Sequence, residues 1–263
     1  MSPPSEADSV ASLSAKLAVD ASIDQQALRR LGNVYGGLNT MLACYLRDGF
    51  VLFDHSKART RIMRSLQHRV DHQLDERAAD LAEVIERHPV RRAFPSRYDP
   101  PVFTTDGCPV LYTKLAAADF ATLSTYTDSD LKSFVALFYE RSLQLSGQST
   151  RENGVPCKGT VDIYDCTDVY WSKLISGFRT HKRVVSTLFD ISEHCPDGLY
   201  KCFVINAPAL ASIAWKLVKP FVSERAQNKV TVSRGIPPEL TTALGGEAKL
   251  RKMMDAPLPP ETV

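Results

Sequence analysis

The stretch LYKCFVINAP, residues 199–208, decides the fold prediction for this chain. Its middle, residues 202–206, is almost wholly apolar, which is typical of a strand buried on both faces of a sheet. A proline follows the strand, and residues 209–221 then show the spacing of an amphipathic helix. The next strand is predicted at residues 229–232. A strand, a helix and a strand in this order predict two parallel strands joined by a crossover.

The same alternation continues towards the N-terminus. Residues 109–112 and 160–164 have the composition of strands, and the first of them follows an Asp-Gly turn. Residues 128–145 and 170–193 predict two long helices, with Asp128 as the N-cap of the first. The alternation therefore predicts an α/β domain whose strands pair largely in parallel.

We divide the chain into four segments by composition. Residues 1–20 are rich in Ser, Ala, Pro and acidic residues, which predicts a flexible arm. Residues 21–90 predict a small helical domain, residues 91–250 the α/β domain, and residues 251–263 a flexible tail. A linker or an extended segment is predicted where four prolines gather, at Pro89, Pro95, Pro100 and Pro101.

The bulk composition excludes several classes of protein. The chain has 263 residues, 44% of them hydrophobic and 24% charged, with a formal net charge of +2. These values are typical of a globular protein. The net positive charge is too small for a protein that wraps nucleic acid around its surface. No apolar run approaches the ~18 residues of a membrane-spanning helix, and the first residues lack a secretory pattern. We therefore expect a soluble cytoplasmic monomer that binds no nucleic acid.

No catalytic motif is evident in the sequence. There is no phosphate-binding glycine loop, no nucleophile elbow and no Cys-x-x-Cys pair, so we expect no cofactor and six reduced cysteines. His68 and His72 have the spacing of metal ligands on a helix. We interpret them as part of a solvated basic face that includes Arg64 and Arg69, and we predict no metal site and no enzyme.

The predicted helix at residues 209–221 leaves two interpretations open. Its apolar residues form one stripe, whereas Lys216 and Lys219 lie off the stripe and Trp215 lies at its edge. Such a helix is typical of a membrane interface, or of a surface helix packed on a sheet. The stripe consists of Leu210, Ile213, Ala214, Leu217, Val218 and Phe221.

These segments together resemble the CRAL-TRIO lipid-binding domain, and most of all the phosphatidylinositol and phosphatidylcholine transfer proteins of that family. The resemblance rests on residues 199–208, on Lys-Pro-Phe at 219–221, on Lys229 and on Leu-Gly-Gly at 244–246. It extends to Asp-Gly-Cys-Pro-Val at 106–110 and, in the helical domain, to Tyr-Leu-Arg at 45–47, Phe53-Asp54 and Lys57-Ala58.

The resemblance implies a fold and a function. The mixed, largely parallel sheet would floor an apolar cavity that shelters one phospholipid, of the phosphatidylinositol or phosphatidylcholine class. A gate helix would open the cavity at a membrane surface, which the protein contacts transiently. Gate and membrane contacts are implied for Leu210, Ile213, Trp215, Leu217 and Phe221, and Tyr164 and Ile205 are implied to line the cavity.

The head-group site implied by the resemblance is altered in this chain. Lys229 matches a phosphate-binding lysine and Asp197 matches the glutamate that pairs with it. A basic pair and a threonine of the family are replaced by Gly49, Phe50 and Ala226. In the site that the resemblance implies for phosphatidylcholine, Thr160 matches a serine of the family, but Asp162 replaces a threonine. A carboxylate at this position repels a phosphate group.

Two alternatives to phospholipid transfer therefore stay open. The chain could be a binding module or adaptor that holds a hydrophobic ligand without phosphate. It could also be an enzyme of unknown class that uses Asp162, Asp165 or His194, although no base and nucleophile pair supports this alternative.

Overall fold

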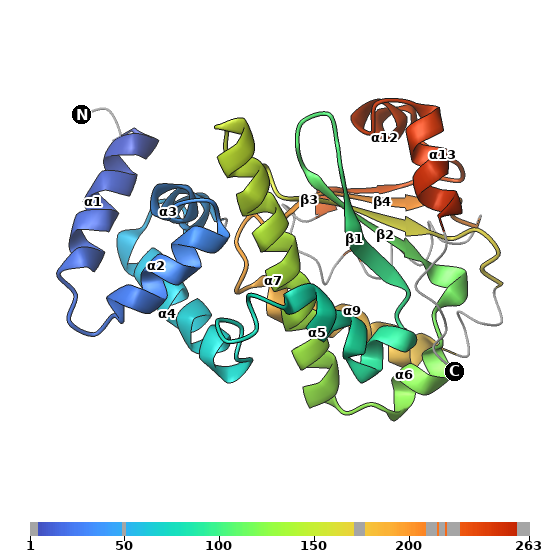
Figure 1. The fold of residues 1–263 in the computed structure, drawn as a ribbon, viewed down its shortest axis with the longest axis horizontal. Coiled ribbons are helices and arrows are strands. Elements are labelled where there is room, and N and C mark those ends of the chain that lie inside the picture. Colours follow the sequence, from blue (N-terminus) through green and yellow to red (C-terminus); the bar gives the residue numbers. More distant parts are fainter. Residues whose placement is uncertain are drawn as a thin grey trace.

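The computed structural model describes residues 5–48, 51–170, 177–208, 215, 219 and 227–256. A group of N-terminal helices precedes an α/β domain, as Figure 1 shows. The N-terminal helices are α1 (Glu6–Ala18), α2 (Gln25–Val34), α3 (Leu38–Arg47), α4 (His55–Asp71) and α5 (Leu81–Arg87), followed by the short helix η1 (Pro89–Arg92).

The α/β domain contains five described strands and the helices that connect or cover them. The strands are β1 (Ser96–Phe103), β2 (Pro109–Lys114), β3 (Thr160–Asp165), β4 (Leu199–Ile205) and β5 (Val230–Val232). The helices are η2 (Leu115–Ala117), α6 (Phe120–Thr125), α7 (Asp128–Asn153), α9 (Phe178–Ser192), α12 (Pro238–Ala243) and α13 (Glu247–Asp255).

The sheet is mixed and mostly parallel, which confirms the predicted fold class. Its strand order is β1-β2-β3-β4-β5. The pairs β2–β3, β3–β4 and β4–β5 are parallel, whereas β1 pairs with β2 antiparallel. The edge strand β1 arises from the proline-rich segment, and its register shifts between Arg97 and Val102. An edge strand with an irregular register is where a sheet tolerates prolines such as Pro100 and Pro101.

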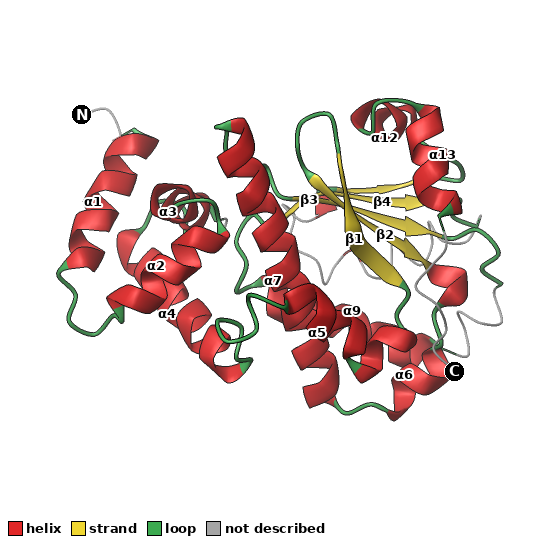
Figure 2. Cartoon of the chain, in the orientation of Figure 1, coloured by secondary structure: helices red, strands yellow, loops and turns green. Residues whose placement is uncertain are grey.

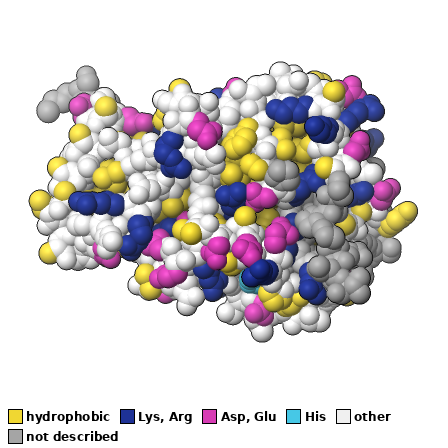
Figure 3. All heavy atoms as spheres, in the orientation of Figure 1, with side chains coloured by type: hydrophobic (Ala, Val, Ile, Leu, Met, Phe, Trp, Pro, Cys, Tyr) yellow, Lys and Arg dark blue, Asp and Glu magenta, His cyan; other side chains and the backbone are white. Residues whose placement is uncertain are grey.

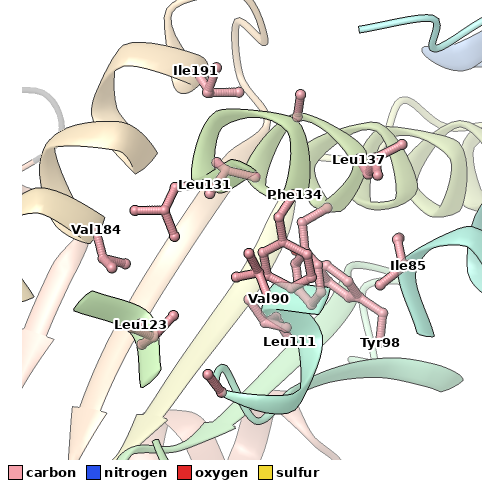
Figure 4. Close-up of a cluster of buried hydrophobic side chains, with 14 of the residues drawn as sticks. Ile85, Val90, Tyr98, Leu111, Leu123, Leu131, Phe134, Leu137, Val184 and Ile191 are labelled. Carbon is pink, nitrogen blue, oxygen red and sulfur yellow. The ribbon is translucent and has the colours of Figure 1, made fainter. Parts of the chain in front are cut away.

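Helices cover both faces of this sheet (Figure 2). On one face, which we call the α7 face, Tyr98 and Leu111 pack with side chains of α5, α6, α7 and α9. Figure 4 shows Phe134 of α7 at the centre of this cluster, close to Val90, Leu111 and Tyr98. On the opposite face, the α13 face, the strands pack against α12 and α13 through Leu240, Leu244, Leu250 and Met253.

Helix α7 connects the two parts of the molecule. It begins at a capping box, in which Thr127 and Asp130 hydrogen-bond each other's backbone amides, so the N-cap is Thr127 and not the predicted Asp128. It ends at Gly154 in the left-handed conformation. Near its C-terminal end, Gly147 lies against α2, where an added Cβ would come within 2.1 Å of the Val34 carbonyl oxygen. Glycine is therefore required for this close approach.

The flexible arm and the flexible tail are wrong for the residues that the structure describes. Residues 6–18 form α1, and Leu13 and Leu17 are buried in the core of the N-terminal helices. Helix α13 includes residues 251–255 and buries Met253. Both helices carry apolar residues at helical spacing, which outweighs their polar composition.

The interpretation of His68 and Arg69 as a solvated basic face is also wrong. Both side chains are buried. The His68 ring stacks on His194 with centroids 4.3 Å apart, and burial lowers the pKa of His68 to about 3. The six cysteines are free thiols, as predicted.

A buried ion pair joins α4 to α7. Arg69 donates to both carboxylate oxygens of Glu140, at 2.6 and 2.9 Å, and also to Asp75. The side chains of Arg69 and Glu140 are 5% and 1% exposed. Although burial alone would lower the pKa of Arg69, the charge of Glu140 raises it. The pair thus holds the N-terminal helices against the α/β domain.

We predict that Glu140→Ala lowers the free energy of unfolding by about 3–5 kcal/mol, because it leaves a buried guanidinium with half of its partners. Urea denaturation measures the change. The control is Glu247→Ala, which removes an exposed pair with Arg251 and should cost less than about 0.5 kcal/mol. Equal losses in the two variants would contradict the role assigned to the buried pair.

Candidate functional site

The parallel register places a row of side chains across the α7 face. Asp162 of β3 is aligned with Leu111 of β2 and Cys202 of β4. Two residues further along the strands, and on the same face, Tyr164 of β3 is aligned with Val204 of β4. Since side chains alternate between faces along a strand, the intervening residues of β3 and β4 belong to the α13 face.

The two faces differ in how completely they are covered. On the α13 face Ile163, Phe203 and Ile205 are fully buried. On the α7 face Asp162, Tyr164, Cys202 and Val204 are only half-buried, although they belong to central strands. The residues of β5 are half-buried as well. The α7 face is therefore incompletely filled over β3, β4 and β5.

Asp162 is the most unusual group on this face. One of its carboxylate oxygens is buried without a hydrogen-bond partner among the described residues. Burial raises the pKa of Asp162 to about 7, and the Thr160 hydroxyl opposes this shift only in part. A buried carboxylate without a cation costs free energy in the folded protein.

Three tyrosines and a thiol lie around Asp162. They are Tyr98 of β1, Tyr139 of α7, Tyr164 of β3 and Cys202 of β4. Burial raises the pKa of each of the four, and the nearby charge of Asp162 raises it further. All four groups are therefore neutral at physiological pH, and they surround the carboxylate with aromatic and weakly polar surface.

The sequence identified two of these residues and missed three. Tyr164 and Asp162 share a strand, so their common face follows from alternation. Tyr98 was hidden in the proline-rich segment. Tyr139 lies one turn beyond Val135, which is on the apolar side of α7, so a longer helical pattern could have found it. Nothing in the sequence around Cys202 predicts a place in the site. Only the strand register shows that Cys202 is aligned with Asp162.

The residues implied for the head group gather where β3 and β4 begin. The Thr160 hydroxyl donates to the Gly198 carbonyl at 3.1 Å. Arg47 approaches the Asp197 carboxylate, with 3.6 Å between the Arg47 Nε and the nearest oxygen. The Lys229 ammonium donates to the Leu199 carbonyl. The structure brings these residues to one end of the sheet, and their role towards a head group stays a prediction.

Ile205 lies on the α13 face and not on the α7 face, and its role in lining the cavity stays a prediction. It is aligned with Asp165 and packs with Phe203 in the cluster that contacts α12 and α13. Its neighbour Val204 is on the α7 face instead. The five gate residues fall largely outside the described residues: Leu210, Ile213, Leu217 and Phe221 lie outside, and Trp215 is described as half-buried. Gly49, Phe50 and Ala226 also lie outside.

A hydrogen-bonded network fixes the end of the sheet next to the predicted gate. Asp165 accepts from Tyr112 at 2.7 Å and from Asn206 at 2.9 Å, and it also accepts from Thr167. Although burial opposes it, these donors lower the pKa of Asp165. Asn206 has a φ of +51°, a conformation that asparagine tolerates. The network sets where the chain leaves β4, just before the predicted gate.

A separate surface depression of about 300 Å³ lies between α4 and the residues before β4. Lys57, Arg61 and Arg64 line it together with Glu193 and His194. Most of the side chains that line it are charged or polar, whereas hydrophobic and aromatic side chains predominate in most ligand pockets. On the face that Figure 3 shows, basic and acidic side chains are interspersed.

The described residues show neither a metal-binding cluster nor a membrane-spanning helix. They contain no group of three or more His, Cys, Asp or Glu side chains placed to hold a metal ion. No described helix is both long and apolar enough to cross a membrane.

The fold is that of an α/β domain with a mostly parallel sheet, covered by helices and preceded by a helical N-terminal region. The CRAL/TRIO domain profile matches residues 101–245. The chain therefore belongs to the CRAL/TRIO domain family, whose domains bind hydrophobic ligands such as lipids. The matched range contains residues 106–110, 199–208, 219–221 and Lys229, on which the resemblance rests, whereas Tyr45–Arg47, Phe53-Asp54 and Lys57-Ala58 of the helical domain lie outside it.

A crystal structure of Sfh5 is similar to this chain, with a TM-score of 0.55 and 14% sequence identity. The similarity covers 89% of this chain and 82% of the Sfh5 chain. At this identity the likeness shows the fold alone. It extends beyond the matched domain, because 89% coverage must include part of the N-terminal helices.

We predict that Asp162→Asn stabilises the protein at high pH. An unfolded aspartate has a pKa near 3.8, whereas that of Asp162 is about 7 in the folded protein. The folded state binds its proton more tightly, so stability falls as pH rises from about 4 to 7. The variant should gain at most about 4 kcal/mol at pH 8 and almost nothing at pH 4.

Urea denaturation at both pH values measures this difference. The control is Asp168→Asn, which makes the same chemical change at an exposed position and should leave stability unchanged at both. An Asp162→Asn variant whose stability differs from wild type equally at pH 4 and pH 8 would contradict the buried, unpaired state of this carboxylate.

Proposed function

We propose that the protein is a carrier that shelters one lipid-like molecule on the α7 face and exchanges it at membrane surfaces. The observation that carries the proposal is the incomplete burial of Asp162, Tyr164, Cys202 and Val204 in the middle of the sheet. Membership of a family whose domains bind hydrophobic ligands supports it. The protein then acts by binding and release, and not as an enzyme.

The energetics of lipid transfer explain why such a carrier works at a membrane. Each methylene that moves from an apolar site into water costs ~0.8 kcal/mol. A lipid with two acyl chains has about 30 methylenes, so its release into water costs on the order of 20 kcal/mol. The ligand therefore passes directly between the carrier and a bilayer, and the carrier contacts the membrane transiently.

The residues 209–221 are proposed as the segment that opens the site. Their apolar stripe, flanked by Lys216 and Lys219, suits a helix that lies in a membrane interface. Their position directly after β4, beyond the Asp165–Asn206 network, supports this role. Contact of Trp215 and Phe221 with a bilayer would expose the ligand and deliver the protein to the membrane in one event.

A phospholipid is one proposed ligand, and a hydrophobic ligand without phosphate is the other. Lys229 and Arg47, at the end where β3 and β4 begin, offer basic groups for a phosphate. Asp162, in the middle of the face, instead favours a ligand that places no phosphate beside it. A phospholipid would therefore have to direct its head group to the Lys229 end.

We predict that filling the α7 face blocks ligand uptake. Val204→Phe adds a ring to a half-buried position near the end of β4, so a fluorescent acyl lipid should bind at least tenfold more weakly than to wild type. The control is Val155→Phe, since Val155 is 66% exposed and belongs to no strand of the sheet. Fluorescence titration measures both, and unchanged affinity in Val204→Phe with an intact fold would contradict this binding face.

We predict that Trp215→Ala slows lipid exchange between vesicles several-fold, because it removes the aromatic anchor of the proposed gate. A lipid-transfer assay with donor and acceptor vesicles measures the rate, and vesicle co-sedimentation measures membrane binding. Phe189→Ala is the control, as it removes an exposed aromatic side chain from α9. Exchange and vesicle binding at wild-type levels in Trp215→Ala would rule out this residue as a membrane contact.

A further inference from the structure

We infer that the α7 face selects an amphiphile that carries an ammonium group, which is held by the Asp162 carboxylate and the rings of Tyr98, Tyr139 and Tyr164. The inference rests on the proposed function, because it names the chemical class of the molecule bound at the same site. It concerns ligands in which no phosphate adjoins the amine.

The first argument is the unsatisfied carboxylate. Asp162 has one buried oxygen without a hydrogen-bond partner among the described residues, and the Thr160 hydroxyl on the same face donates to the Gly198 carbonyl. No described cation forms an ion pair with it. A buried carboxylate that is left unpaired is retained at a cost, and a ligand that brings its own positive charge removes that cost on binding.

The second argument is that cations on the neighbouring elements are engaged elsewhere. Arg141 of α7 pairs with Asp99 of β1 at 2.5 Å. Lys201 of β4 pairs with Glu239 of α12, on the opposite side of the sheet. Lys229, before β5, donates to the backbone carbonyl of Leu199. The described residues therefore supply no cation that pairs with the Asp162 carboxylate.

The third argument is the aromatic surroundings. Tyr164 is two residues from Asp162 on the same face of β3. Tyr98 and Tyr139 pack in the cluster that contains Leu111, which is aligned with Asp162. Aromatic faces attract a cation through their quadrupoles. Tyrosines around a carboxylate form a site that suits an ammonium group, whereas they offer nothing to an anion.

The ligand class follows from charge and shape together. An anionic head group beside Asp162 would be repelled in surroundings of low dielectric constant, which disfavours fatty acids and a phosphate at this position. A neutral alcohol could donate one hydrogen bond, but it would leave the negative charge unbalanced. A long-chain amine satisfies both the carboxylate and the apolar, half-buried Val204.

The experiment compares three probes that share a hexadecyl chain and differ in the head group: hexadecylamine, hexadecanol and hexadecanoic acid. Each displaces a neutral apolar fluorophore from the protein at pH 8, where both Asp162 and the amine are charged. In wild type the amine should displace the fluorophore at a concentration at least tenfold lower than the alcohol, and the acid should be weakest.

Variants separate the carboxylate from the rings. Asp162→Asn keeps the shape of the side chain and should abolish the tenfold advantage of the amine, while the alcohol changes less than about twofold. Asp168→Asn, at an exposed position, should leave the order of the probes intact. Tyr139→Phe should keep the preference for the amine and Tyr139→Leu should reduce it, because a ring face is what binds the cation.

The outcomes distinguish the inference from the proposed function. If none of the three probes displaces the fluorophore from wild type and vesicle lipids are not bound either, the carrier function fails. If the amine and the alcohol bind equally in wild type, or if Asp162→Asn keeps the preference for the amine, the inference is wrong and the carrier function stands. Circular dichroism of each variant verifies the fold.

Discussion

The parallel register of β2, β3, β4 and β5 is the constraint on which the site depends. It aligns Asp162 with Leu111 and Cys202, and it places Tyr164 beside Val204 on the same face. A shift by one residue would exchange this face with the α13 face and would bury Asp162 against α12 and α13. The Asp165–Asn206 network, at the far end of β3 and β4, helps to hold that register.

The two faces of the sheet differ in how completely helices cover them, and the proposed function rests on this difference. The α13 face is closed by a compact apolar cluster, which contributes stability. The α7 face is packed near β1 and β2 by α7, but stays half-buried over β3, β4 and β5. An unpaired carboxylate persists there at a cost in stability. Features that cost stability in a folded protein are often retained for binding, and in the proposed function a ligand supplies the missing partner.

Much of the fold was predictable because strands β2, β3, β4 and β5 are apolar runs between clear helices. The proline-rich strand β1 was predicted as a linker or an extended segment, since its edge position cannot be seen in the sequence. Helix α1 was hidden by its polar composition, although Leu13 and Leu17 have helical spacing. Within the site, the alternation of strand residues predicts that Asp162 and Tyr164 share a face, whereas the sequence alone does not show that Ile205 packs towards α12 and α13. Contacts such as Arg47 with Asp197 depend on tertiary packing and leave no local pattern.

The central claim is that the α7 face holds one lipid-like molecule, and native mass spectrometry tests it most directly. The purified protein is incubated with vesicles of mixed phospholipids, neutral lipids and long-chain amines, separated from them and measured intact. The account predicts a single added mass, bound one to one, whose value identifies the ligand class. A folded protein that retains no ligand from these vesicles would contradict the account.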